Sequence, residues 1–192
     1  MKILFIQLPL QDHSHGYING NIDYAPAVIS GFIKKRFPDI ACETLPAVIA
    51  NFCSDEVIVR YIISESPDYL CFTSYLWNVE RNLHIAERVK SSAPAVKIFF
   101  GGPEISSGSY ALNEHRPFVD CFITGEGEWF FGRYLSGADI NYSCINKNRI
   151  ALQPPDALIA ADEIFEPLSG MRLNAMIDGS VFLELTRGCP YR

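Results

Sequence analysis

The sequence predicts an α/β protein with a flavodoxin-like (Rossmann-like) sheet of five parallel strands, flanked by helices on both faces. Apolar runs of strand length alternate with segments of helical spacing, as in β-α-β units. Two of these runs end abruptly in glycine, at Gly101-Gly102 and at Gly125-Glu126-Gly127. Because ligands of parallel sheets bind at the carboxyl ends of the strands, these glycine segments also predict where a site would lie.

Each expected element has a local signal. Pro26 stands in the first turn of the first helix, where its missing N–H costs nothing. Ser54 or Asp55 is a suitable N-cap for the second helix. The third helix has apolar residues at helical spacing on one side and charged residues on the other. In chain order we expect strands over about 3–8, 41–45, 69–73, 96–100 and 119–124, with helices over about 25–37, from 54 or 55, 78–92 and 128–135.

The pattern changes after Gly137. Segments 142–145 and 149–152 flank Asn146-Lys147-Asn148 and predict a β-hairpin, and the prolines at 154 and 155 indicate a linker. A further strand is expected over 181–185. We therefore divide the chain into an α/β domain (1–137), a hairpin and linker (138–180), and the beginning of another domain (181–192).

Composition limits the function. The chain has 192 residues, 48% of them hydrophobic, which suits one main core. Its net charge of −6 disfavours nucleic acid as a primary partner. Gln7 and Pro9 interrupt the first apolar run, and no run approaches the roughly 18 apolar residues of a membrane helix. We expect a cytoplasmic protein without a membrane partner. Cys71 and Cys121 lie in apolar runs and are expected in the core.

The most specific segment is the last one. Thr186-Arg187-Gly188-Cys189-Pro190-Tyr191-Arg192 follows the strand expected at 181–185. It resembles the start of the C-x-x-x-C-x-x-C motif of the radical S-adenosylmethionine family. The resemblance implies that Cys189 is the first of three thiolates that hold a [4Fe-4S] cluster, whose fourth iron binds S-adenosylmethionine. The second cysteine would follow Arg192. We therefore expect a truncated chain that is inactive by itself and whose missing partner is its own radical SAM barrel.

A second resemblance covers about residues 1–137 and concerns cobalamin-binding domains, which carry S-x-L and then G-G after successive strands. Ser74-Tyr75-Leu76 and Gly101-Gly102 occupy these places. The resemblance implies that the serine hydroxyl bonds the nucleotide tail of the corrinoid, while the glycines admit close backbone approach. The expected cofactor-binding residues are Ser74, Tyr75, Leu76, Gly101, Gly102, Pro103, Glu104, Gly125, Glu126 and Gly127.

The first loop departs from the cobalamin pattern. The family carries D-x-H-x-x-G there, whereas this chain has Ser14 two residues after Asp12. Cobalamin without a histidine on cobalt is one interpretation, and a domain that has lost the cofactor is another; His13 and His15 are the alternative ligands. Tyr17, Tyr75 and Trp77 are candidates to pack on a flat corrin ring, although core or interface packing also explains such aromatics. Turn formation and helix-dipole complementation are the plain explanations of the glycines and of Glu126 and Glu128.

These observations favour a cofactor-binding accessory domain of a cobalamin-dependent radical SAM enzyme, whose whole protein performs methyl transfer or other radical chemistry. The alternative is a cofactor-free module for substrate recognition or protein interaction that keeps the same fold. A response-regulator-like receiver would need an aspartate after the third strand, where this chain has Thr73-Ser74.

Overall fold

The computed structural model describes residues 1–11, 18–19, 23–106 and 108–157. The expected strand at 181–185 and Cys189 lie outside these described residues. The strands are β1 (Lys2–Ile6), β2 (Leu10–Gln11), β3 (Ile18–Asn19), β4 (Ala41–Thr44), β5 (Tyr69–Thr73), β6 (Lys97–Gly101), β7 (Cys121–Thr124), β8 (Tyr142–Ile145) and β9 (Asn148–Leu152). The helices are α1 (Tyr24–Arg36), α2 (Ala47–Phe52), α3 (Asp55–Glu65), α4 (Val79–Ser92) and α5 (Gly127–Ser136), with a 3-10 turn, η1 (Tyr110–Leu112).

The main sheet confirms the predicted fold class but not the predicted strand count. It has seven strands in the order β4-β1-β5-β6-β7-β9-β8 rather than five. The five expected strands are all present and parallel. The expected hairpin adds two more, because β9 pairs in parallel with β7 while β8 pairs antiparallel with β9. A separate two-stranded sheet joins β2 and β3.

Apolar side chains explain why the hairpin joins the sheet. Ile150 and Ala151 of β9 are 1% and 0% exposed, and they lie in register with Phe122 and Ile123 of β7. This pairing also satisfies backbone groups that an edge strand at β7 would leave open. Periodicity in the sequence predicts the two strands of a hairpin, but it carries no information about which sheet edge accepts them.

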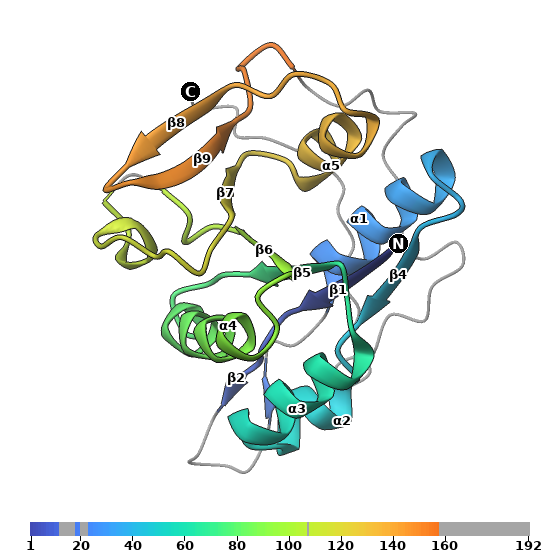
Figure 1. Ribbon diagram of the computed structural model, residues 1–192, viewed down its shortest axis with the longest axis vertical. Helices are drawn as coiled ribbons and strands as arrows, with labels where there is room; N and C mark the ends of the chain where they lie inside the picture. Colours follow the sequence, from blue (N-terminus) through green and yellow to red (C-terminus); the bar gives the residue numbers. More distant parts are fainter. Residues whose placement is uncertain (12–17, 20–22, 107, 158–192) are drawn as a thin grey trace.

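Helices cover both faces of the main sheet, with α1 and α5 on one side and α3 and α4 on the other (Figure 1). The alternation along β1 fits this arrangement. Leu4 and Ile6 belong to the core under α3 and α4, whereas Ile3 and Phe5 belong to the core under α1 and α5. Side chains of successive strand residues point to opposite faces, so β1 is buried on both.

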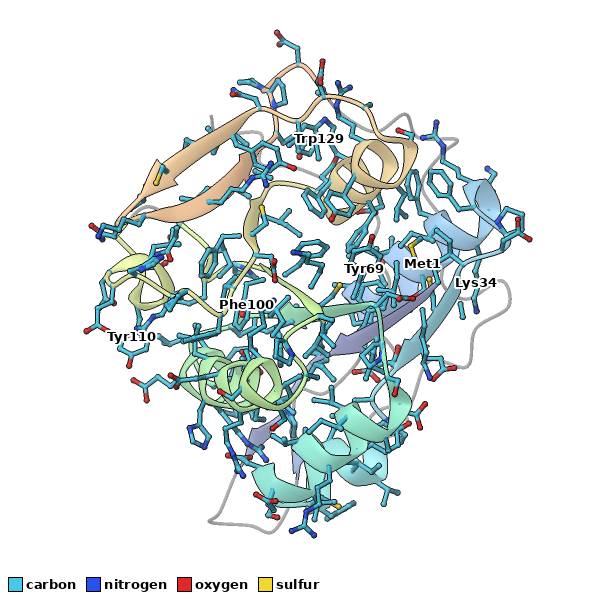
Figure 2. All side chains as sticks on the ribbon, viewed as in Figure 1. Met1, Lys34, Tyr69, Phe100, Tyr110 and Trp129 are labelled. Atoms are coloured by element: carbon cyan, nitrogen blue, oxygen red, sulfur yellow. The ribbon has the colours of Figure 1, made fainter. Side chains whose placement is uncertain are left out.

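Aromatic side chains fill the core under α5. Phe99 of β6 packs edge to face on Phe130 and on Tyr134, with ring centroids 5.4 Å and 5.1 Å apart. Trp129 belongs to the same core and lies beside the β8–β9 hairpin, as Figure 2 shows. These contacts hold α5, the helix expected over 128–135, on the sheet, although it begins at Gly127 rather than Glu128.

The chain order places the topological switch point of the sheet at the carboxyl ends of β1 and β5. From β1 the chain crosses to β4 on one side, and the next strand, β5, pairs with β1 on the other side. Such a topological switch point is where open α/β sheets bind ligands. α2, which follows β4, is a short helix that the sequence pattern does not predict. In the described part of the chain, no helix is both long enough and apolar enough to span a membrane.

Candidate functional site

Two loops meet at the carboxyl edge of the sheet. Ser74, directly after β5, donates its backbone N–H to Gly101 O at 2.7 Å, and Glu104 donates its N–H to Ser74 O at 3.1 Å. These bonds join the loop after β5 to the loop after β6. The structure thus brings together the S-x-L and G-G segments that the sequence places at successive strand ends. Ser74 is 0% exposed, whereas Gly102 on the other side of the junction is exposed.

Gly102 makes this junction possible. Its φ is +109°, a conformation that L side chains rarely adopt, and a β-carbon there would lie 2.6 Å from Ser74 O and 2.7 Å from Ser74 N. Gly101 differs, because a β-carbon at that position would meet only Ile123 Cβ, at 3.9 Å. Within the described residues, the group that comes too close to Gly102 for a side chain is therefore the backbone of Ser74, in the loop after β5.

Exposed apolar groups cover the outside of the loop after β5. Leu76 is 80% exposed and Trp77 is 44% exposed. The rings of Tyr75 and Trp77 stack with centroids 4.5 Å apart and planes 4° from parallel. Partial burial raises the pKa of the Tyr75 phenol. This surface, which we call the 75–77 platform, consists of Tyr75, Leu76 and Trp77.

Two buried asparagines, which sequence reasoning missed, support the 75–77 platform from beneath. Asn78 and Asn82 are 1% and 0% exposed and lie one helical turn apart at the start of α4. Asn82 Nδ2 donates to Asn78 Oδ1 at 3.2 Å and lies 3.5 Å from Ser74 Oγ. The sequence feature that could have revealed them is a pair of asparagines four residues apart among the apolar positions of a helix, since buried polar side chains require hydrogen-bond partners.

The predicted residues after β7 contact a different part of the chain. Glu126 donates its backbone N–H to Gln153 Oε1 at 2.6 Å, while Gln153 Nε2 donates to Ala157 O at 2.6 Å and to Glu126 Oε2 at 3.2 Å. Gly125 has a φ of +93°, and a β-carbon there would lie 2.7 Å from Gln153 Cβ. Gly127 serves helix packing, because its β-carbon would overlap Ile29 Cδ1 of α1.

A partly buried carboxyl group, that of Asp23, stands at the beginning of α1. Asp23 is the N-cap residue of α1, yet its side chain makes no capping hydrogen bond. Burial raises the pKa of Asp23 to about 7. The carboxylate form is therefore disfavoured at this position of the folded chain, whereas a solvated aspartate would be ionised at neutral pH.

Three of the five cysteines in the described residues lie in the core. Cys42, Cys71 and Cys121 are buried free thiols, which confirms that Cys71 and Cys121 are core residues. Burial raises the pKa of the Cys42 and Cys121 thiols to about 11. No group of three His, Cys, Asp or Glu side chains in the part that the structure describes could hold a metal ion. His13, His15, Tyr17 and Cys189 lie outside that part.

Comparison with known proteins assigns the family. The family model of the B12 binding domain matches residues 39–134, which include β5, β6, β7 and the loops after them. The chain belongs to the B12-binding domain family. This B12-binding domain is 36% identical over 70 residues to the cobalamin-dependent radical SAM methyltransferase TokK of Streptomyces tokunonensis. It is 33% identical over 69 residues to a 2-(S-pantetheinyl)-carbapenam-3-carboxylate methyltransferase of Streptantibioticus cattleyicolor.

Both alignments cover 36% of this chain and 10% of the relative, so the matched segment spans about a tenth of each relative's length. Among solved structures, the B12-binding domain is similar to a CheY-like protein (TadZ) of Pseudomonas aeruginosa PAO1. The TM-score is 0.43 at 13% identity, over 73% of this chain and 98% of that one. A likeness at this level carries no functional information.

Proposed function

We propose that this B12-binding domain binds a corrinoid at the carboxyl edge of its sheet, as the accessory domain of a cobalamin-dependent radical SAM enzyme. The observation that carries the proposal is the 75–77 platform. It presents a stacked aromatic pair and an 80% exposed leucine beside the switch point of the sheet. Large exposed apolar groups that are held in place are typical of binding surfaces.

The described residues suit a corrinoid. A flat, largely apolar ring system is complementary to the 75–77 platform, and Gly102 and Pro103 are exposed in the adjacent loop. Ser74 lies at the base of these loops, where a hydroxyl can donate to a polar group of the ligand. Glu104 belongs to the same pair of loops, and we place Gly101 in the supporting backbone. Bound cobalamin would supply a cobalt centre that can carry a methyl group.

The loop after β7 forms a second part of the proposed edge. Gln153 holds Glu126 and packs on Gly125. We propose that these residues and Gly127 contribute the rim of the site and set the direction in which the chain leaves the sheet. Their contribution to binding would then be indirect, through the position of the loop.

The whole protein would add the radical chemistry. We propose that Cys189 supplies the first thiolate of a [4Fe-4S] cluster and that S-adenosylmethionine binds there, in a catalytic barrel that follows this domain. The names of the two relatives support methyl transfer as the reaction. This chain would contribute the corrinoid and its orientation rather than the radical.

One observation favours the alternative of a cofactor-free recognition module. Ser74 is 0% exposed, so a ligand reaches its hydroxyl only after neighbouring groups move. A module that has lost its cofactor would keep the 75–77 platform as a protein contact. The two functions differ in whether the chain takes up cobalamin.

A titration separates the two functions. Hydroxocobalamin added to the 192-residue chain should change its visible spectrum on binding and quench tryptophan fluorescence, to saturation at one equivalent. Trp77→Ala should weaken binding about ten-fold through lost ring contact. Tyr110→Ala is the matched control, because Tyr110 is also 44% exposed but lies in η1, beside the β8–β9 turn. Absence of binding by the parent chain would favour the cofactor-free module.

A further inference from the structure

The side chain of Asn78 connects the ends of β1 and β5, the two strands at the switch point. Its Nδ2 donates to Leu8 O, in the segment after β1, at 3.0 Å and to Thr73 O, at the end of β5, at 3.2 Å. Its Oδ1 accepts the backbone N–H of Tyr75 at 2.8 Å. One side-chain amide thus bonds to the segment that follows each of the two strands at the switch point.

The same residue fixes the turn that bears the 75–77 platform. Tyr75 O accepts the backbone N–H groups of Asn78 and Val79, at 3.1 Å and 3.0 Å. Together with the bond from Tyr75 N–H to Asn78 Oδ1, these contacts close the turn from both ends. Leu76 and Trp77 are therefore exposed at the top of a turn whose base is buried and bonded.

Asn82 holds the amide of Asn78 in this orientation. Its Nδ2 donates to Asn78 Oδ1 and to Thr73 O, both at 3.2 Å. Its Oδ1 is buried without a hydrogen-bond partner in the described part of the chain. An unsatisfied buried acceptor is costly, so an apolar residue would serve the core of α4 better. Asn82 offsets this cost through the hydrogen bonds that fix Asn78 and the end of β5.

We propose that Asn78 is a positioning residue of the corrinoid site, and that Asn82 holds it in place. Asn78 fastens the 75–77 platform to the segment after β1, so that the segments after β1 and β5 are preorganised before the ligand arrives. This inference rests on the proposed function. Groups fixed before binding lose less conformational freedom on binding, which raises affinity. Removing the Asn78 bridge therefore weakens corrinoid binding even where the domain stays folded.

Two substitutions at Asn78 separate its two roles. Asn78→Ala removes all four side-chain bonds. Asn78→Asp keeps the acceptor that receives Tyr75 N–H and Asn82 Nδ2, but an ionised carboxylate cannot donate to Leu8 O or Thr73 O. The aspartate variant should retain the turn yet lose the bridge between Leu8 O and Thr73 O.

Asn148 provides a matched control for loss of a buried asparagine. It is 3% exposed, accepts Arg116 N–H at 2.8 Å and donates to Glu114 O at 2.8 Å. These bonds join the beginning of β9 to the segment before β7, at the amino edge of the sheet. Asn148→Ala should therefore reduce stability without changing the ligand edge.

The experiment measures hydroxocobalamin affinity of the 192-residue chain, with urea unfolding of each variant to separate affinity from stability. A Trp129→Phe background leaves Trp77 as the single tryptophan, whose near-ultraviolet circular dichroism reports its stacking on Tyr75. We expect Asn78→Ala and Asn78→Asp to weaken binding about ten-fold or more, since each loses at least two hydrogen bonds. Asn78→Asp should keep the Trp77 signal, and Asn148→Ala should bind like the parent.

Each other outcome overturns the inference. If either Asn78 variant binds within about two-fold of the parent, the bridge is not needed for affinity. If Asn148→Ala weakens binding equally, the effect is loss of stability rather than positioning. If the parent chain itself takes up no hydroxocobalamin, the proposed function fails and this inference fails with it, a result that the parent titration alone identifies.

Discussion

The backbone of Ser74 lies against the α-carbon of Gly102, so closely that a β-carbon there would be 2.6 Å from Ser74 O. Gly102→Ala should therefore lower the free energy of unfolding by about 2–4 kcal/mol, from strain at positive φ and from overpacking. Hydroxocobalamin affinity should fall with it, because the two loops are forced apart. Urea unfolding and the titration measure both effects.

Gly108→Ala is the control for backbone strain alone. Gly108 also has a positive φ, of +85°, but a β-carbon there would meet nothing within 4 Å. Gly108→Ala should lower the free energy of unfolding by about 1 kcal/mol. Equal losses at both positions would show that contact with Ser74 is not what requires glycine at Gly102.

The loops after β5 and β6 show which features of the site the sequence predicts and which it does not. Ser74 and Gly102 are predictable as neighbours, because parallel strands end at one edge and short motifs mark those ends. The sequence motif predicts that Gly102 admits a ligand, but it does not predict that the backbone of Ser74 is the group that Gly102 approaches. Asn78 escapes notice for a related reason, because its partners Leu8 and Thr73 are backbone carbonyls, which every residue has. The partner of Gln153 likewise depends on how the hairpin joins the sheet.

A double-mutant cycle tests the contact between Gly125 and Gln153. Gln153→Ala removes the bonds to Glu126 and Ala157 and should cost about 1–3 kcal/mol. Gly125→Ala should be more costly in the parent than in the Gln153→Ala background, because alanine at 153 removes Oε1 and Cδ, with which the new methyl group collides, and leaves only the contact with the β-carbon of residue 153. Additive effects on the free energy of unfolding would contradict this contact.

Asp23 predicts a pH dependence of stability. Its pKa rises from 3.8 to about 7 on folding because the carboxyl is partly buried and loses hydration. The folded chain therefore binds more protons than the unfolded chain between these values, and stability falls as the pH rises from about 4 to 7. Asp23→Asn should be more stable than the parent above this range and similar to it near pH 4.

Urea unfolding from pH 4 to pH 8 measures this difference. Asp39→Asn, at an exposed position just after α1, is the control. An equal increase in the free energy of unfolding for Asp39→Asn would assign the effect to a cause other than burial of Asp23. So would an increase for Asp23→Asn that does not change with pH.

The role proposed for Cys189 requires two further thiolates. A cluster of this kind needs three thiolates in one loop, and residues 181–192 contain one. Anaerobic reconstitution of the 192-residue chain with iron and sulfide should give no stable cluster absorption. A chain that continues through the catalytic barrel should give it and lose it on Cys189→Ala; a cluster that persists after this substitution would contradict the radical SAM assignment.

Amide hydrogen exchange with and without hydroxocobalamin tests most directly whether cobalamin binds at the carboxyl edge of the sheet. Exchange should slow in peptides that contain residues 74–78 and 101–105, at the carboxyl ends of β5 and β6. It should not change in the groove at the opposite edge, formed by the ends of α3 and α4 and including Ile62, Tyr69 and Val96. Protection of that groove, or binding without protection of either loop, would contradict the account.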